Sequence, residues 1–388
     1  MSLLPRGGGD LLPHIRDRLI GEFGFVGRAS HLRMGVCPSC GKKSLWTFAE
    51  TPWVVRCERL NHCGYEAHAK ELFPDLFESW TDRVSRREAA RPPEQRNPTA
   101  VADEYLRVGR GFELALIKGT YTQEQYFNPS ADDGRGAGTT TVRFALAGAD
   151  MWWERLIDQP GRFGKMKARF KPGGKAGGRW WQLPGLQLLP EHDGAADLDQ
   201  PPPDLWLVEG IFDAIALCSH GINAVAALSS SWYPAESLAE LAAAVAALGD
   251  GAKRPRLVVA LDNDRAGQAG THRLVEKARA DGWVCTAAQA PQAGAKLDWN
   301  DLHLRGRLEP PHIDEYLYQG ALLLAETAAD KALLIHNRTG RMEFDLHHKN
   351  RLYWFKLDVE KFSKAVDQVD KDIEAGYRQP MGDAAKRE

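Results

Sequence analysis

The chain has 388 residues and a formal net charge of −2, with 43% hydrophobic and 26% charged residues. This length and composition predict two or three packed domains of about 100–200 residues each. The near-neutral charge excludes a globally basic protein, so any nucleic-acid-binding surface must be local. No apolar run reaches the ~18–20 residues that span a bilayer, and the first residues have no signal-peptide core. We therefore expect a cytoplasmic protein without a membrane partner.

The first 80 residues are predicted to hold a short amphipathic helix over 11–25 and then a metal-binding domain. Strand-like runs S-L-W-T-F and W-V-V-R separate two pairs of cysteines, Cys37 and Cys40, then Cys57 and Cys63. A close pair of thiols followed by a looser pair is typical of tetrahedral Zn²⁺ sites. A C-x-x-C pair without an export signal also favours metal over disulfides. We expect one structural zinc ion, although the wider second pair leaves open a part for His62.

The middle of the chain is predicted as a linker over 81–100 and a domain over 101–203. This domain combines a helix candidate near 101–118, strand-like runs T-V-R-F-A-L and W-W-Q-L, and a polar loop at 191–204. Residues 161–179 carry seven basic side chains and no acid. Lys and Arg among glycines and aromatics suit a phosphate backbone and stacked bases, although a solvated loop is the alternative. The residues expected to bind nucleic acid or nucleotide are Lys165, Lys167, Arg169, Lys171 and Lys175.

Strands and helices alternate over residues 204–305. Apolar runs such as L-W-L-V and R-L-V-V-A-L are separated by helical segments such as I-F-D-A-I-A-L-C-S-H. This alternation predicts βαβ units and a mostly parallel sheet. The fold class expected is α/β, within an α+β multidomain chain of zinc ribbon, mixed basic subdomain and parallel-sheet domain. The extension at 306–388 is predicted to hold a helix over 311–328 and one strand-like run, F-D-L-H-H-K-N-R-L-Y-W-F-K-L.

Carboxylates follow two of the predicted strands. Glu209 closes one strand, and Asp262 and Asp264 close another. Because parallel strands end at the same edge of a sheet, we expect these side chains to converge. Oxygen ligands of this kind select Mg²⁺ or Mn²⁺, and phosphoryl transfer is the usual chemistry of such a site. A surface turn is the alternative for the D-x-D pair. Three further carboxylates extend the set: Asp213, Asp298 and Asp301.

Three runs, V-E-G-I-F-D-A-I-A-L, A-L-D-N-D-R-A-G-Q-A-G and L-D-W-N-D-L, resemble the Toprim domain of primases. With the four-cysteine ribbon ahead of them, they resemble zinc-binding, Toprim-containing DNA primases, especially the primase part of phage- or mobile-element-type primase–helicases. The resemblance covers residues 30–70 and 204–305. It implies catalytic and metal-binding roles for Glu209, Asp262 and Asp264. It also implies that the further carboxylates serve as magnesium ligands.

The resemblance implies a DNA primase that makes short RNA primers on single-stranded DNA by Mg²⁺-dependent nucleotidyl transfer from ribonucleoside triphosphates. A replicative helicase is the implied partner, in trans or as a missing C-terminal domain. Two other classes share some of these features. A Toprim nuclease or topoisomerase would break phosphodiesters with the same carboxylates, and a non-catalytic zinc-and-Toprim module would only bind DNA. The G-K-[ST] core of a Walker A motif is absent, so no ATP-driven motor is expected in this chain.

Overall fold

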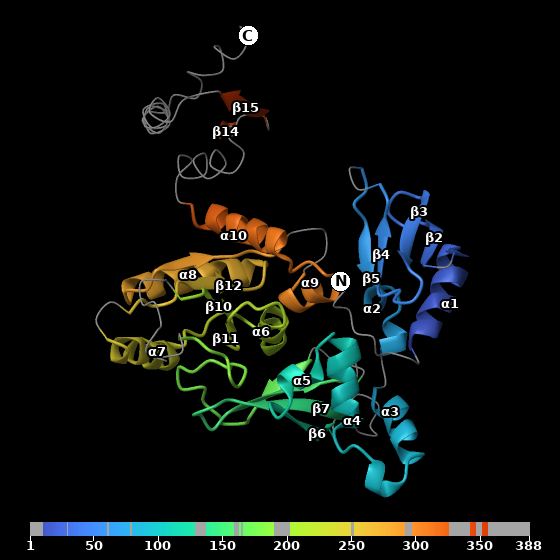
Figure 1. The fold of residues 1–388 in the computed structure, drawn as a ribbon, viewed down its shortest axis with the longest axis horizontal. Helices are drawn as coiled ribbons and strands as arrows, with labels where there is room; N and C mark the ends of the chain where they lie inside the picture. The colour runs from blue at the N-terminus through green and yellow to red at the C-terminus, as the bar shows by residue number, and fades with distance from the viewer. Residues whose placement is uncertain are drawn as a thin grey trace.

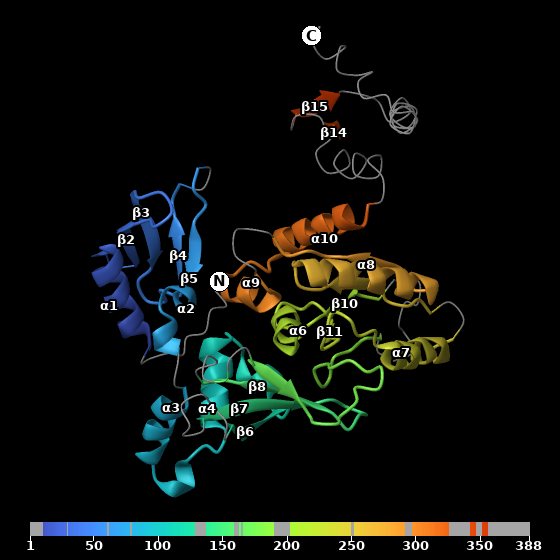
Figure 2. The same cartoon turned by 180° about the vertical axis from the view of Figure 1, so that it is seen from behind.

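The computed structural model describes residues 11–28, 30–59, 62–77, 80–128, 137–158, 163, 166–189, 202–249, 252–291, 297–325, 342–346 and 351–355. An N-terminal ribbon, a middle antiparallel sheet and a parallel α/β sheet follow one another along the chain (Figures 1 and 2). The chain is thus a mixed α/β protein with a parallel-sheet domain, as its sequence predicts.

The ribbon is a five-stranded antiparallel sheet with helix α1 (Leu11–Phe23) beside it. Helix α1 buries Leu11, Ile15 and Leu19, which a four-residue spacing places on one helix face. It ends before Gly24, whose φ of 67° suits the left-handed residue that follows a helix. The helix and strands predicted between residues 11 and 57 are confirmed. The strands, in sheet order, are β1 (Val26–Arg28), β2 (His31–Val36), β3 (Lys43–Phe48), β4 (Val54–Cys57) and β5 (Glu66–His68).

The segment 81–100 is largely helical, which corrects its prediction as a linker. Helix α3 (Trp80–Ala89) buries Trp80 and Val84 to 2% and 1% exposure, one turn apart. The N–H of Thr81 donates to Asp158 of the middle domain at 2.9 Å. Glu88 is buried on the same face as Trp80 and Val84, whereas Arg86 and Arg87 are exposed, so the charged composition of the segment was a poor guide to its structure. The short helices around it are α2 (Ala69–Leu72), η1 (Pro74–Phe77) and η2 (Pro93–Gln95).

The middle domain starts with a broken helix rather than the continuous one predicted near 101–118. Helix α4 (Ala100–Glu104) runs into the π-helical turn η3 (Tyr105–Gly109), and α5 (Leu114–Ile117) follows. The run W-W-Q-L is not a strand, since Trp181 makes only an isolated bridge to Ala226. The loop expected at 191–204 lies, up to residue 201, outside the described residues. The antiparallel sheet contains, in order, β6 (Tyr121–Asn128), β7 (Ala137–Ala145), β8 (Trp152–Leu156) and β9 (Ala168–Phe170).

The sheet is parallel, as the alternating pattern predicts, and its strands have the order β11-β10-β12-β13. Its strands are β10 (Leu205–Val208), β11 (Ala224–Ala226), β12 (Leu257–Ala260) and β13 (Cys285–Ala287). The connecting helices are α6 (Ile211–Cys218), α7 (Ala235–Ala247), α8 (Arg265–Ala280) and α9 (Trp299–Leu304), and α10 (Pro310–Leu324) follows them. Both faces are covered, because Trp206 and Val208 pack in one core cluster with α6 residues, whereas Leu205 and Leu207 pack in another with α7 and α8 residues.

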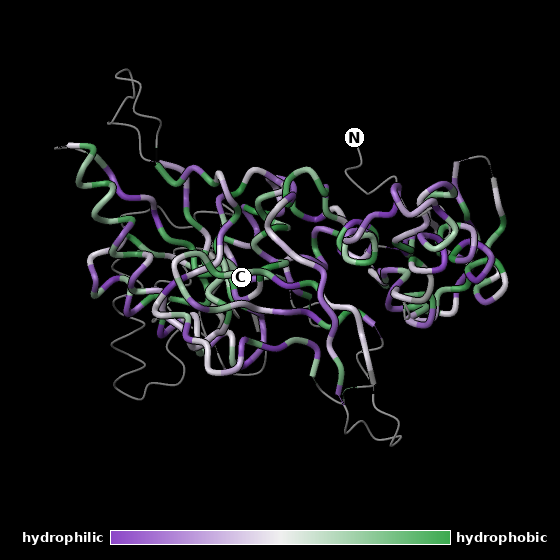
Figure 3. Tube along the Cα trace, turned by 90° about the horizontal axis from the view of Figure 1, so that it is seen from below, coloured by the Kyte–Doolittle hydropathy of each residue, from purple (hydrophilic) through white to green (hydrophobic). Residues whose placement is uncertain are grey.

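Hydrophobic and hydrophilic stretches are interspersed along the coloured parts of the trace (Figure 3). Strands β14 (Met342–Leu346) and β15 (Arg351–Phe355) pair antiparallel, so the run predicted as one strand near the C-terminus forms two. Among the described helices, none combines the length and apolarity needed to cross a membrane.

Candidate functional site

Four thiols meet in the ribbon, where Cys37 follows β2 and Cys57 ends β4. The Sγ atoms of Cys37, Cys40, Cys57 and Cys63 lie within 4.8 Å of one another. Among the described residues, no other three or more Cys, His, Asp or Glu side chains come together in this way, and His62 is not part of the group. A backbone hydrogen bond is the main cause that lowers the pKa of the Cys40 thiol to about 6, which favours the metal-binding thiolate. The donor set fits a tetrahedral zinc ion.

The predicted carboxylates gather at the carboxyl edge of the parallel sheet. Glu209 follows β10, Asp262 and Asp264 follow β12, Asp213 lies in the first turn of α6, and Asp298 and Asp301 lie at the start of α9. Asp298, Asp262 and Asp301 each raise the pKa of Asp213 through their charge, so these four are close together. They share an edge without converging on one point as the thiols do. We call the six carboxylates the acidic rim.

Crowding of the acidic rim is visible in two pKa values. Burial, followed by the charge of Asp298, raises the pKa of Asp213 well above its ordinary value. The same two causes raise the pKa of Asp301 to about 6. A divalent cation would relieve this repulsion, and carboxylate oxygens are the ligands that Mg²⁺ and Mn²⁺ prefer. The acidic rim therefore fits such an ion.

Two carboxylates of the acidic rim also cap helices. Asp264 accepts a hydrogen bond from the N–H of Gly267 at 2.8 Å, at the start of α8. Asp298 accepts one from the N–H of Asp301 at 2.7 Å, and the Asp301 side chain accepts from the Asp298 N–H in return. Each carboxylate has two oxygens, so capping orients the group and leaves capacity for a metal.

Three basic side chains that the sequence analysis missed lie beside the acidic rim. Lys70 comes from α2 of the ribbon, Arg110 directly follows η3, and Arg155 lies in β8. The charge of Arg110 is the main cause that lowers the pKa of Lys70 to about 8, and burial lowers that of Arg155. These shifts indicate buried positive charge that the chain compensates only in part. We call Lys70, Arg110 and Arg155 the cationic wall.

Asn300 connects the cationic wall to the acidic rim. Arg110 is 5% exposed and donates to the Asn300 Oδ1 at 3.0 Å and to the Tyr105 Oη at 2.8 Å. Asn300 donates through its side chain to the Arg110 carbonyl at 2.9 Å and through its backbone N–H to Asp213 at 3.2 Å. The guanidinium of Arg110 also lies 4.4 Å from the centre of the Phe212 ring. These contacts hold the two charged sets in a fixed relation.

The backbone after Arg110 is fitted closely to α9. Gly111 has a φ of 77°, and a Cβ there would lie 2.8 Å from Leu304. Its carbonyl lies 2.9 Å from the His303 Nε2. Both the left-handed conformation and the close approach therefore require glycine at this position.

The basic segment predicted to bind nucleic acid forms ion pairs with acids of β8 and of the turn before it. Arg169 pairs with the fully buried Glu154 at 2.7 Å, and Lys171 pairs with Asp150. Lys167 and Lys175 are exposed, and Lys175 lines a cavity of about 470 Å³. Lys165 lies outside the described residues. The two exposed lysines are therefore the best placed of this set to meet a nucleic acid.

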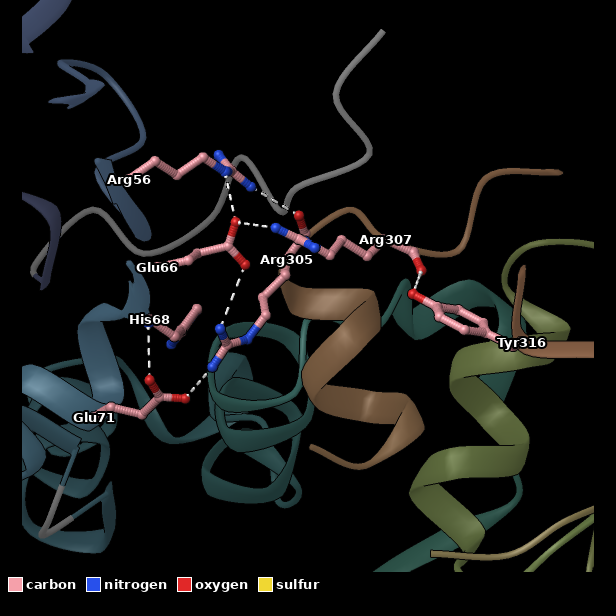
Figure 4. Close-up of polar contacts among 7 residues, drawn as sticks. All are labelled: Arg56, Glu66, His68, Glu71, Arg305, Arg307 and Tyr316. Carbon is pink, nitrogen blue, oxygen red and sulfur yellow. Dashed lines mark hydrogen bonds and ion pairs between the residues drawn. The ribbon is translucent and has the colours of Figure 1, made fainter. Parts of the chain in front are cut away.

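The ribbon is joined to α9 by a network of ion pairs (Figure 4). Arg305, which caps the C-terminal end of α9, pairs with Glu66 at 3.3 Å and also with Glu71. Arg307 and Arg56 bind the same Glu66, at 2.9 Å and 2.8 Å. Arg56 also donates to the Arg305 carbonyl at 2.9 Å. These contacts hold α2, and with it the ribbon's member of the cationic wall, beside α9.

Residues 206–303 match the family described as Toprim-like. The parallel sheet with its acidic edge is therefore a Toprim-like domain. Among proteins of known function, a DNA primase of Mycoplasma pneumoniae (strain ATCC 29342 / M129 / Subtype 1) is 34% identical over 107 residues. The match spans 28% of this chain and 16% of that primase. This part of the chain is thus homologous to DNA primase.

Solved structures of primases superpose loosely on the chain. The RNA polymerase domain of Mycobacterium tuberculosis primase DnaG is 16% identical, with a TM-score of 0.38 over 75% of this chain and 99% of that one. The same domain in complex with double-stranded DNA also gives a TM-score of 0.38 at 16% identity, over 77% of this chain and 96% of that one. The primase fragment of the bacteriophage T7 primase–helicase protein is 13% identical, with a TM-score of 0.27 over 76% and 99%. These low TM-scores do not establish a shared arrangement of the parts.

Proposed function

We propose that this protein is a DNA primase that makes short RNA primers on a single-stranded DNA template by Mg²⁺- or Mn²⁺-dependent nucleotidyl transfer. The observation that carries the proposal is the acidic rim beside the cationic wall. A nucleoside triphosphate binds together with a divalent metal ion. The metal ion would contact the acidic rim, and the negatively charged phosphates would contact the cationic wall. The Toprim-like match and the sequence relationship to a DNA primase support the same function.

The acidic rim would hold the metal, with Glu209, Asp262 and Asp264 as its central ligands. When bound, the metal would neutralise and align the phosphates. The cationic wall would bind the triphosphate and stabilise the negative charge that develops on the leaving pyrophosphate. The 3′-hydroxyl of the growing primer attacks the α-phosphate of the incoming nucleotide, so the protein supplies no nucleophile. Asn300 positions Arg110 for this role through its paired hydrogen bonds.

The zinc ribbon would engage the template strand, in keeping with the phage- or mobile-element-type primases that the sequence resembles. A replicative helicase is the partner we propose, since primers are needed where template is unwound. Action in the cytoplasm, where template and ribonucleotides meet, is part of the same proposal. Docking of the ribbon against α9 brings the template-binding part next to the catalytic part.

Primer synthesis is the direct test. Full-length protein, labelled ribonucleoside triphosphates, Mg²⁺ and mixed-sequence single-stranded DNA should give short, alkali-labile products. The Asp262→Asn variant should give none. Cleavage of the DNA without incorporation would support a Toprim nuclease instead, and DNA binding with neither activity would support a non-catalytic module.

A further inference from the structure

A second cavity lies where the ribbon meets the far end of α9. It has a volume of about 370 Å³ and is lined by Arg56 and Glu66 of the ribbon and by Arg305, Arg307 and His312. This volume is within the range of ordinary ligand sites. None of these residues belongs to the acidic rim or the cationic wall.

Positive charge is in excess around this cavity. Glu66 accepts ion pairs from all three arginines, and the one other carboxylate of the network, Glu71, pairs with Arg305 (Figure 4). One positive charge is therefore left over in the network. The side chains of Arg305 and Glu66 are only 5% and 8% exposed, whereas those of Arg56 and Arg307 are 25% and 42% exposed, so the surplus charge is accessible to a ligand from solvent. A single monoanionic group would balance it.

Two residues that line the cavity each contain a buried nitrogen atom with no hydrogen-bond partner among the described residues, namely the Arg305 Nε and the His312 Nδ1. The Arg305 Nε–H is a buried donor, and buried donors without an acceptor are costly. Guanidinium groups bind phosphate oxygens through several N–H donors at once. Charge and donors therefore indicate the same chemistry, an anion with several oxygen acceptors.

We propose that this cavity binds one phosphodiester group of the single-stranded template, between the ribbon and the active site. The site rests on the proposed function for the identity of its strand. Arg305 caps one end of α9, and Asp298 caps the other. Asp298 and Arg305 are seven residues apart, so at about 1.5 Å per residue this short helix separates the cavity from that end of the acidic rim by roughly 10 Å, a distance that a few nucleotides can span. A strand held here would continue towards the metal-binding carboxylates.

The test measures binding of a labelled oligothymidylate to the full chain at several salt concentrations. Arg307→Met removes one lining cation and leaves Arg305 and Arg56 to hold Glu66. Its log–log salt slope should become shallower by about 0.7, the value for one lost contact with single-stranded DNA. Arg56→Met, on the ribbon side, should give a similar change. Because both arginines are proposed to bind one phosphate, the decrease in slope of the double variant should be smaller than the sum of the two single decreases.

Arg256→Met is the matched control. Arg256 pairs with Asp204 and is 46% exposed, against 42% for Arg307. It directly precedes β12, at the amino-terminal end of the strands and thus opposite the acidic rim. Its slope should equal that of the unmodified chain. Equal slopes for Arg307→Met and the unmodified chain would overturn the proposal. It would also be overturned if Arg307→Met bound ribonucleoside triphosphate more weakly but bound the oligothymidylate unchanged. Unmodified protein that makes no primers but keeps an Arg307-dependent slope would contradict the primase function and leave this site standing.

Discussion

The acidic rim and the cationic wall bind the same substrate in the proposed function, but they are assembled differently. All six carboxylates of the rim come from the Toprim-like domain, where strand ends and helix starts position them. The three cations of the wall come from the ribbon, the residue after the turn η3, and strand β8. The rim is therefore a property of one domain, whereas the wall exists only when three parts of the chain are packed together.

Removing zinc should have the largest effect, because it removes one part of the wall and leaves the rim in place. Apparent zinc-binding free energies of about 10–16 kcal/mol in small modules mean that Cys57→Ser, or a strong chelator, should unfold residues 30–70. Hydrogen exchange should show lost protection there and retained protection in β10 and β12. Protein purified without chelators that contains no zinc would contradict this prediction.

Asp262→Asn should reduce primer synthesis by at least about a hundredfold, because it removes a proposed metal ligand and a charge from the rim. Thermal stability should hold or rise slightly, since the neighbouring carboxylates repel one another. Calorimetry and the primer assay should therefore diverge. Undiminished Mg²⁺-dependent synthesis by this variant would remove the rim from the mechanism.

The two sets should respond to pH in opposite directions. Burial and Asp298 raise the pKa of Asp301 from 3.8 to about 6, so without metal its contribution to stability should fall as pH rises from about 4 to 6. Arg110 and burial lower the pKa of Lys70 from 10.5 to about 8, so its contribution should rise between about pH 8 and 10.5. Each change is of the order of 1–3 kcal/mol.

Matched variants separate these two contributions. The free energy of unfolding would be measured against pH by chemical unfolding of full-length protein that retains zinc but has no Mg²⁺ or Mn²⁺. Asp301→Asn should flatten the curve between about pH 4 and 6, and Lys70→Met should flatten it between about pH 8 and 10.5. Lys118→Met, at an exposed lysine after α5, is the control for loss of a positive charge. Unchanged limbs in the first two variants would mean that rim and wall are not electrostatically strained.

The smallest effect is expected in the basic segment outside both sets. Lys167→Gln with Lys175→Gln should reduce the salt slope of template binding by about 0.7 for each lysine that contacts a phosphate. Arg169→Gln should instead destabilise the fold by about 1–3 kcal/mol, because it removes a partner from the buried Glu154. An unchanged slope in the double variant would direct the template elsewhere.

Local sequence patterns predicted the parallel sheet, the cysteine cluster and the position of the rim carboxylates. The parallel sheet followed from the alternation of apolar strands with helices, and residues such as Trp206 and Leu207 are buried on opposite faces of this sheet. The cysteine pairs were recognisable because ligand spacing is itself a sequence signal. The rim carboxylates were found in the same way, as residues that follow buried strands.

The cationic wall had no such signal. Lys70, Arg110 and Arg155 stand in three unrelated segments, and only tertiary packing brings them together. The helix over 80–89 was missed for another reason, because Trp80 and Val84 are the sparse apolar stripe of a largely charged stretch. The ion pairs within the basic segment also had no sequence signal, since the acids that pair with Arg169 and Lys171 are 15 and 21 residues away.

The π-helical turn η3 sets the direction in which Arg110 faces. A π-turn holds one residue more than an α-turn, and such insertions often occur at functional sites. Deleting one residue within Tyr105–Gly109 would restore regular α-helix, yet it would rotate all that follows by roughly 100° around the helix axis. Arg110 would then face away from Asn300. The π-helical turn is therefore required for Arg110 to face Asn300. A variant with one residue deleted from the turn should gain local helicity and lose nucleotide affinity.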